Sequence, residues 1–226
     1  MNKFALGTAV GAIAILAQAA SAATVTHTDS VALEATNWNY TLSVPQFDAA
    51  LGTLNSVIVT LVGYVEGSGM AENMGPGAAT ITLNLQADIS AATAALGTIV
   101  QTLPVVSSVH AVSGHDGNLD FTGTSGVNTG LQNATQTDSE TLTGGSLSEF
   151  IGAGIVSVVM DAQGMSQGTG AGNLITSFTT EAKADLTVVY DYTAAPPPPV
   201  VPLPASAPLL LGGLFLLGQA RRRFKS

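Results

Sequence analysis

The sequence predicts an all-β domain, an antiparallel β-sandwich of the jelly-roll-like or Ig-like kind, flanked by an N-terminal signal peptide and a C-terminal apolar helix. Three observations predict the sandwich. Apolar and polar residues alternate with a period of two along several segments. Turns rich in Gly, Ser and Asn separate these segments. Thr and Val are abundant, and long runs of Glu, Lys, Leu and Arg are missing. A sandwich is favoured over a barrel because several strands are long and two-faced.

The strongest alternation lies in two segments, Thr80–Ile89 and Ala182–Tyr192. In the first, every odd position is apolar and every even position is polar, which predicts a strand with one buried face. In the second, one face is expected to be buried; it consists of Ala182, Ala184, Leu186, Val188, Tyr190 and Tyr192. Leu54–Glu66 is apolar on both faces, with Val57, Val59, Leu61 and Val65 on one and Ile58 and Val62 on the other. It is therefore expected to lie centrally or to have its outer face partly covered.

The remaining elements are weaker in the sequence. Further strands are predicted at Val25–Leu33, Trp38–Val44, Leu96–Val112 with a break near Pro104, and Ile155–Met160. Turns or loops are predicted at Gly67–Gly77, Ser113–Asn118, Gly123–Gly130, Gly144–Gly145 and Gly164–Gly172. The first and last of these are expected to be long loops at the ends of the sandwich. Ser146–Ile151 is predicted to form one helical turn, with Ser146 and Glu149 completing a capping box.

The N-terminus has the three parts of a secretory signal peptide. Lys3 supplies a positive charge, Phe4–Ala17 is apolar, and small residues follow at Ala20–Ala22. Residues 1–22 are therefore expected to be removed by signal peptidase between Ala22 and Ala23, which leaves 23–195 as the domain proper.

The C-terminus carries a second targeting pattern. A Pro-rich linker spans 196–204, and residues 205–226 combine an apolar segment with a basic tail. The apolar part, Ala205–Gly218, has 14 residues, fewer than the ~20 that cross a bilayer comfortably. The basic cluster is expected to remain cytoplasmic as a membrane stop; it contains Arg221, Arg222 and Arg223.

The junction reads Val201-Pro202-Leu203-Pro204-Ala205. With the apolar and basic segments that follow, it resembles the VPLPA-CTERM sorting signal of Gram-negative bacteria, which is related to PEP-CTERM. The resemblance covers only the tail. It implies export, a transient stay in the inner membrane, cleavage by an exosortase-type transpeptidase, and delivery to the cell surface or the extracellular space.

The mature domain is strongly acidic. All fifteen Asp and Glu residues lie within 23–195, where Lys183 is the single Lys or Arg. Such a domain repels phosphate backbones, so nucleic acid is excluded as a partner. The chain has no cysteine. The exported domain must therefore be stable through its apolar core rather than through disulfides.

Three blocks of the middle region carry a second resemblance. They are Thr28–Leu54, which contains Asn37, Trp38 and Phe47, then Asp120–Gly126 and Gly172–Tyr192. Together they resemble the choice-of-anchor E domain of exported bacterial proteins. The likeness implies a surface-attached β domain and provides no catalytic residues.

Two patterns suggest metal ligands. Asp116, Asn118, Asp120 and Thr122 alternate along one segment, as oxygen ligands of calcium do. However, Phe121 stands where an EF-hand has its glycine and Val127 where it has its bidentate acid, so a turn is the favoured interpretation. The chain's histidines, His27, His110 and His115, form no HxH or HExxH motif. They are expected to be exposed, and no metal or cofactor is predicted.

The sequence contains no recognisable set of catalytic residues. Gly123-Thr124-Ser125-Gly126 lacks the spacing of a nucleophile elbow. Glu140 paired with Glu149 or with Asp138 would suit glycoside chemistry, but acids in Ser- and Thr-rich loops are usually solvated. We therefore predict a non-enzymatic protein with a structural or adhesive role in the envelope or matrix. The alternative is a carbohydrate-binding surface module, with a matrix polysaccharide stacked on Trp38 and Tyr40; these aromatics are instead expected in the core.

Overall fold

The computed structural model describes residues 21–196, which include the whole β domain. The predicted signal-peptide core, the sorting motif Val201–Ala205 and the C-terminal apolar and basic segments lie outside the described residues. Within residues 21–196, no helix has both the length and the apolar character needed to span a membrane.

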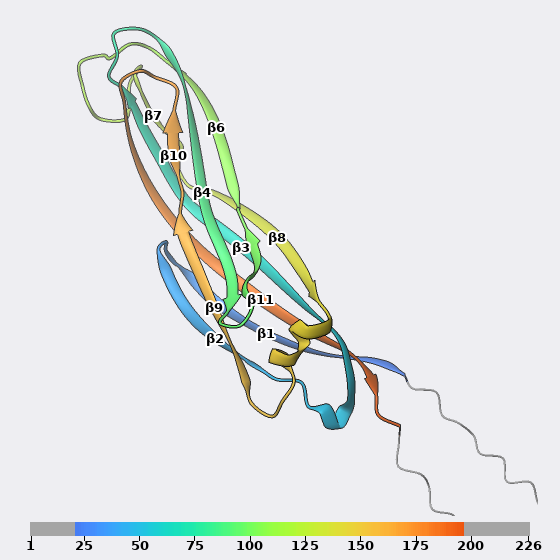
Figure 1. Cartoon of the computed structure of the whole chain (residues 1–226). Helices are drawn as coiled ribbons and strands as arrows, with labels where there is room; N and C mark the ends of the chain where they lie inside the picture. The colour runs from blue at the N-terminus through green and yellow to red at the C-terminus, as the bar shows by residue number, and fades with distance from the viewer. Residues whose placement is uncertain (1–20, 197–226) are drawn as a thin grey trace, which may run out of the picture. The chain divides into compact units, whose positions relative to one another are not determined.

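The domain consists of two antiparallel sheets packed face to face (Figure 1). In the first sheet, β3 (Gly52–Asn73) lies between β11 (Leu174–Ala194) and the pair β7 (Gly126–Asn128) and β8 (Gln132–Leu142), and β1 (Ala22–Ala35) borders β11. The second sheet is built around β4 (Ala79–Thr93). One edge of β4 pairs with β9 (Ile155–Gly164) and β10 (Gln167–Thr169), and the other with β5 (Gly97–Thr102) and β6 (Val105–Val112); β2 (Trp38–Pro45) borders β9. The predicted all-β sandwich is confirmed.

The core lies between the sheets, and the predicted strand faces are confirmed. The alternating positions Ala182, Ala184, Leu186, Val188 and Tyr190 of β11 are all buried. The same holds for Val57, Val59, Leu61 and Val65 of β3, and for Ile81, Leu83, Leu85, Ala87 and Ile89 of β4. Tyr192, predicted on the same face of β11, is only partly buried, and a register shift precedes it. Both β3 and β11 pair on both edges, as expected of central strands.

The two longest strands define the two ends of the domain. β11 pairs with β3 along its whole length, from Ala194 beside Gly52 to Leu174 beside Asn73. A strand of 21 residues is ~70 Å long at ~3.3 Å per residue. At one end, here called the terminal end, Ala194 donates a backbone hydrogen bond of 2.9 Å to Ser21. At the other, the loop end, β3 turns into β4 and β11 begins (Figure 1).

The prediction of a long loop at Gly67–Gly77 is wrong. β3 continues through Met70 to Asn73 because its backbone there remains paired with β11 on one edge and with β7 on the other. Part of the predicted loop Gly164–Gly172 is also strand, since β9 ends at Gly164 and β10 follows. Glycines weaken the sequence signal of a strand, yet here they allow close packing between neighbouring backbones.

Two further elements differ from expectation. β8 had no predicted counterpart because this edge strand is polar and exposed at most positions, so apolar alternation is missing. The predicted helical turn at Ser146–Ile151 is a 3-10 helix, η2 (Gly144–Phe150), whose N-cap Thr143 makes no side-chain cap. The predicted capping box is therefore wrong. The Glu149 carboxylate instead accepts a hydrogen bond of 2.8 Å from the Thr93 hydroxyl. A second 3-10 helix, η1 (Ala49–Leu51), precedes β3.

Candidate functional site

A cluster of metal-ligand side chains lies at the loop end. Glu72 lies next to the last residue of β3. His115 and Asp116 come from the loop 113–125 between β6 and β7. One candidate ligand atom from each residue lies within 4.8 Å of the other two. We call these three residues the loop-end cluster. It is the one group of this kind among residues 21–196.

Glu72 is fully buried, which is unusual for a carboxylate. Its two oxygens have different partners. The hydroxyl of the buried Ser125 donates to Oε1, and the backbone N–H of Phe121 donates to Oε2 at 2.9 Å. Phe121 has a φ of 57°, a left-handed conformation that a non-glycine residue seldom adopts. The loop is thus shaped to direct its donors at this buried carboxylate.

The neighbouring Asn73 fixes the loop in place. Its Nδ2 donates to the carbonyl groups of Gly77 and Ser113, both at 2.8 Å, and its Oδ1 accepts from the Gly75 N–H at 2.9 Å. His115 is bound to the turn between β3 and β4, because its backbone N–H donates to the Gly75 carbonyl at 2.8 Å. The cluster therefore rests on a hydrogen-bonded frame rather than on a free loop.

Hydrogen bonds also orient the exposed member of the cluster. The Asn118 N–H donates to Oδ1 of Asp116 at 3.1 Å. This bond is the largest cause of a lowered pKa for the Asp116 carboxyl; Ser125, Thr124 and the nearby His115 lower it further, and partial burial opposes them. Asp116 is therefore held in the ionised form that ligates cations.

No Lys or Arg within residues 21–196 balances these carboxylates. Lys183 is the only such side chain in that range, and its Nζ lies 3.9 Å from Asp185 in β11. A buried carboxylate is costly unless a counter-charge or several donors compensate it. At the loop-end cluster, the neighbouring side chain with ring nitrogens is that of His115. Its Nδ1 is buried and has no hydrogen-bond partner.

The structure separates the residues that the sequence suggested for calcium. Asp116 and Asp120 each bind the backbone N–H two residues further on, at 3.1 and 2.9 Å, which is the geometry of a turn-forming aspartate. Asp120 also accepts from the Thr122 hydroxyl at 2.8 Å and is not part of the loop-end cluster. Sequence reasoning missed Glu72 because it lies far away along the chain, in a segment predicted as a glycine-rich loop.

The expectation of exposed histidines is wrong in degree, since all three are partly buried. His27 packs with its ring edge against Tyr190, with centroids 5.6 Å apart. His110 has a buried Nε2 without a partner, but it lies on β6 outside the cluster. Only His115 joins other ligand-type side chains. The one available signal was its neighbour Asp116.

The aromatic pair on β2 does not form a flat platform. Trp38 is buried, as expected, and its Nε1 donates to the Ala182 carbonyl at 3.2 Å. Tyr40 is 45% exposed, so the expectation that it lies in the core is wrong. A stacked sugar would therefore meet one phenol ring, which removes the observation that motivated a carbohydrate-binding module.

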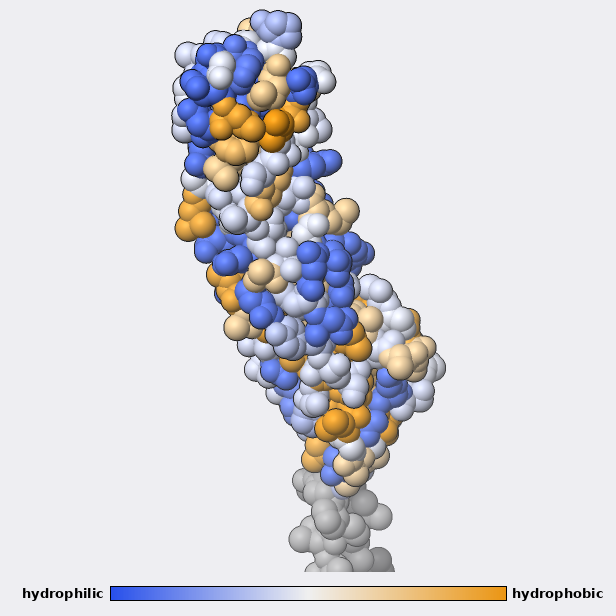
Figure 2. All heavy atoms as spheres, turned by 90° about the vertical axis from the view of Figure 1, so that its left-hand side faces the viewer, coloured by the Kyte–Doolittle hydropathy of each residue, from blue (hydrophilic) through white to orange (hydrophobic). Residues whose placement is uncertain are grey.

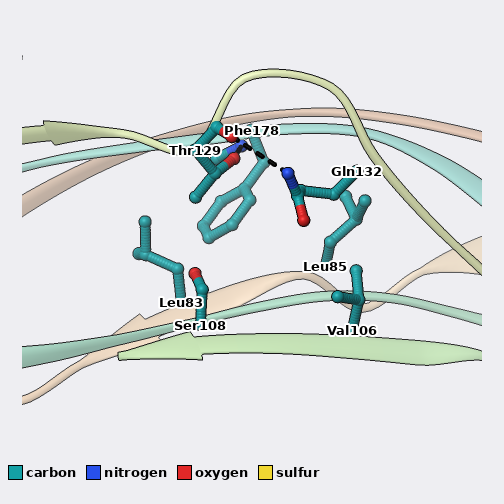
Figure 3. Close-up of a pocket in the computed structure, with 8 residues that line it drawn as sticks. Leu83, Leu85, Val106, Ser108, Thr129, Gln132 and Phe178 are labelled. Carbon is teal, nitrogen blue, oxygen red and sulfur yellow. Dashed lines mark hydrogen bonds between the residues drawn. The ribbon is translucent and has the colours of Figure 1, made fainter. Parts of the chain in front are cut away.

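The interior offers little space for a substrate. A cavity of about 10 Å³ lies between the sheets beside Phe178, with room for one water molecule at most (Figure 3). Leu83, Leu85 and Val106 line it, and Gln132 Nε2 donates to the Thr129 carbonyl at 3.0 Å. None of its lining residues is acidic. Among the carboxylates considered for glycoside chemistry, Asp138 and Glu140 are exposed on β8, whereas Glu149 is bound to Thr93.

The face of the domain shown in Figure 2 is mixed in hydropathy. Figure 2 shows one face on which hydrophobic residues form small separate groups among hydrophilic ones. Isolated exposed apolar residues are normal on soluble domains.

Comparisons with known proteins give no assignment. No family model matches the chain, and no curated protein matches it. Among solved structures, the chain is similar to that of the infectious bursal disease virus Gt strain, at 14% identity over 77% of this chain and 37% of that one, with a TM-score of 0.18. A VP2 subviral particle of the same virus gives 11% identity over 75% and 37%, with a TM-score of 0.21. The chain thus spans little more than a third of these proteins, and scores this low carry no argument about function.

Proposed function

We propose that this protein is an exported, non-catalytic β-sandwich that is anchored at the cell surface and has a structural or adhesive role in the envelope or extracellular matrix. The observation that carries the proposal is the placement of the two ends of the domain. β1 begins and β11 ends side by side, where Ala22 pairs with Thr193. A module attached through its C-terminal side would therefore present its loop end about one strand length, ~70 Å, from the attachment point.

The targeting segments supply the route. In this proposal, signal peptidase cuts between Ala22 and Ala23, and an exosortase-type transpeptidase acts at Val201–Ala205 while Arg221–Arg223 hold the chain in the inner membrane. The Pro-rich residues that follow β11 would serve as a stiff spacer, because polyproline chains extend by ~3 Å per residue. The acidic domain would remain soluble and would not bind nucleic acid.

Surface display can be tested with a single introduced thiol, because the chain has no cysteine. Asn118→Cys places a thiol on the exposed part of the loop 113–125. A membrane-impermeant maleimide should label this variant, produced as the full chain, on intact Gram-negative cells that have an exosortase. The unsubstituted chain is the control. Labelling that requires cell lysis would rule out surface display.

The structural or adhesive role needs its own test. Residues 23–195 contain nearly all of every strand and both apolar clusters of the described structure. This domain should be retained by isolated extracellular matrix or by an array of matrix polysaccharides, and it should release no product from them. Turnover of a glycan or peptide substrate would contradict the non-catalytic assignment.

A further inference from the structure

We propose that Glu72, His115 and Asp116 form a binding site for a divalent transition-metal ion of the zinc class, which fastens the loop 113–125 to the end of β3. This inference goes beyond the proposed surface role, because it assigns a ligand to the domain itself. It rests on three features of the loop-end cluster: its donor set, its charge, and the support behind each ligand.

The donor set suits zinc. One imidazole and two carboxylates are all ordinary zinc ligands, bound at ~2.0–2.2 Å. Ligand atoms on one zinc ion stand somewhat over ~3 Å apart at those bond lengths. In the structure they lie within 4.8 Å of one another, so the three ligand atoms would move closer together when zinc binds. Three protein ligands leave a fourth position for water or for a donor from another molecule.

The charge balance favours a cation. Glu72 is fully buried and its carboxylate lies beside that of Asp116. Two carboxylates therefore converge here, and the single Lys or Arg of residues 21–196, Lys183, lies with Asp185 instead. A divalent ion neutralises both carboxylates and also occupies a ring nitrogen, in a place where His115 Nδ1 is buried without a partner.

Each ligand also has support behind it. Ser125 and the Phe121 N–H hold the Glu72 carboxylate, and the Asn118 N–H holds Asp116. Carboxylate oxygens have further lone pairs, so these bonds leave room for a metal. Metal sites commonly orient their ligands through such partners, and removing those partners weakens binding by ~10–100-fold. The glycine at 126 permits this arrangement, because a Cβ there would collide with the backbone of Thr122.

Calcium fits less well. It prefers six to eight oxygen ligands and has little use for an imidazole nitrogen. Asp120, which would be needed to enlarge the oxygen set, is engaged with Thr122 instead. The competing explanation without a metal is that the hydrogen bonds from Ser125, Phe121 and Asn118 alone hold the two carboxylates in place.

The test is zinc titration by calorimetry of the metal-stripped protein, performed on residues 23–195 and on the full chain in detergent. We expect one zinc ion per chain and a melting temperature that rises with zinc but not with millimolar calcium. His115→Ala should weaken zinc binding by at least ~10-fold. The matched control is His110→Ala, which removes a partly buried histidine outside the cluster and should bind zinc as the unsubstituted chain does.

Cobalt provides a second readout. Co²⁺ bound at this site should give visible d–d absorption that Asp116→Asn reduces and His110→Ala leaves unchanged. Asp116 is exposed, so this variant should keep its fold, which circular dichroism checks. The proposal is overturned if the folded parent binds no zinc, if His115→Ala binds zinc as tightly as the parent, or if calcium stabilises the domain as well as zinc does. The first outcome would leave those hydrogen bonds as the explanation of the cluster, and none of the three outcomes would bear on surface display.

Discussion

At the scale of single residues, Tyr190 links the core to the terminal end. It is fully buried, it contacts the rings of Phe47 and Phe150, with centroids 6.0 and 6.3 Å away, and its hydroxyl donates to the Pro45 carbonyl at 2.7 Å. Burial raises its pKa to about 12, because the phenolate form would lose its hydration.

This raised pKa predicts alkaline instability. The unfolded chain loses the Tyr190 proton near pH 10, whereas the folded chain keeps it to about pH 12. Between these values the unfolded state binds fewer protons, so the free energy of unfolding falls as pH rises, by ~1.4 kcal/mol for each pH unit. Below pH 10 this contribution is fully present. Denaturant titrations of Tyr190→Phe should show a smaller fall in the free energy of unfolding between pH 10 and 12 than those of the parent. At pH 7 the variant should be less stable than the parent by ~1 kcal/mol, because the hydrogen bond to Pro45 is lost. Identical slopes would mean that another group controls the transition.

Gly67 shows why a glycine within a strand need not indicate a loop. A Cβ at this position would collide with the backbone carbonyl of Thr179 in β11, which cannot move without disturbing the sheet. Gly67→Ala should therefore destabilise the domain by ~1–3 kcal/mol through overpacking. Gly77→Ala is the matched control, because a Cβ at Gly77 meets no atom within 4 Å. Thermal unfolding of the two variants compares them, and equal melting temperatures would contradict the close packing.

At the scale of elements, β11 tests the register of the first sheet. Leu186 is 1% exposed and lies opposite Leu61 of β3, whereas Lys183 points to the outer face beside Tyr64. Leu186→Ala should lower the free energy of unfolding by ~2–5 kcal/mol, through lost apolar contact and the cavity that remains. Lys183→Ala should change it by less than ~0.5 kcal/mol. Urea titration measures both. Equal effects of the two substitutions would mean that the register of β11 is wrong, since a slip of one residue turns every side chain of the strand to the other face.

The elements also show how far the sequence leads. Strands with strict alternation, such as β4 and the second half of β11, are predictable because burial of one face forces that pattern. β8 is not predictable in this way. It is held by backbone pairing with β3 and needs few apolar side chains. The extension of β3 and the loop-end cluster share one cause: their residues are positioned by partners distant in the chain, namely β7, β11 and the loop 113–125. The local pattern of apolar and polar residues does not predict those long-range contacts.

At the scale of the whole molecule, the two ends of the β domain carry different features. The terminal end joins the first and last strands, and the loop end gathers the buried Glu72 and the loop that binds it. Because β1 begins at Ala22 and β11 ends at Ala194, all described strands remain essentially complete if the flanking segments are removed. Cleavage after Ala22 would remove the first pair of the β1–β11 ladder, between Ala22 and Thr193, and the backbone hydrogen bond from Ala194 to Ser21.

This arrangement predicts that the mature surface form lacks both flanking segments yet has the stability of the full domain. Intact-mass analysis of protein released from the cell surface should give a chain that starts at Ala23 and ends near Val201–Ala205, without Arg221–Arg223. Replacing both motif prolines, Pro202→Ala with Pro204→Ala, should leave the basic tail attached and the chain in the inner membrane, because the processing enzyme would no longer recognise its site. The matched control is Pro197→Ala with Pro198→Ala in the linker, which leaves the motif intact and should be processed normally. Recovery at the surface of a chain that still carries Arg221–Arg223 would refute the processing route, while the fold of residues 22–194 would stand unaffected.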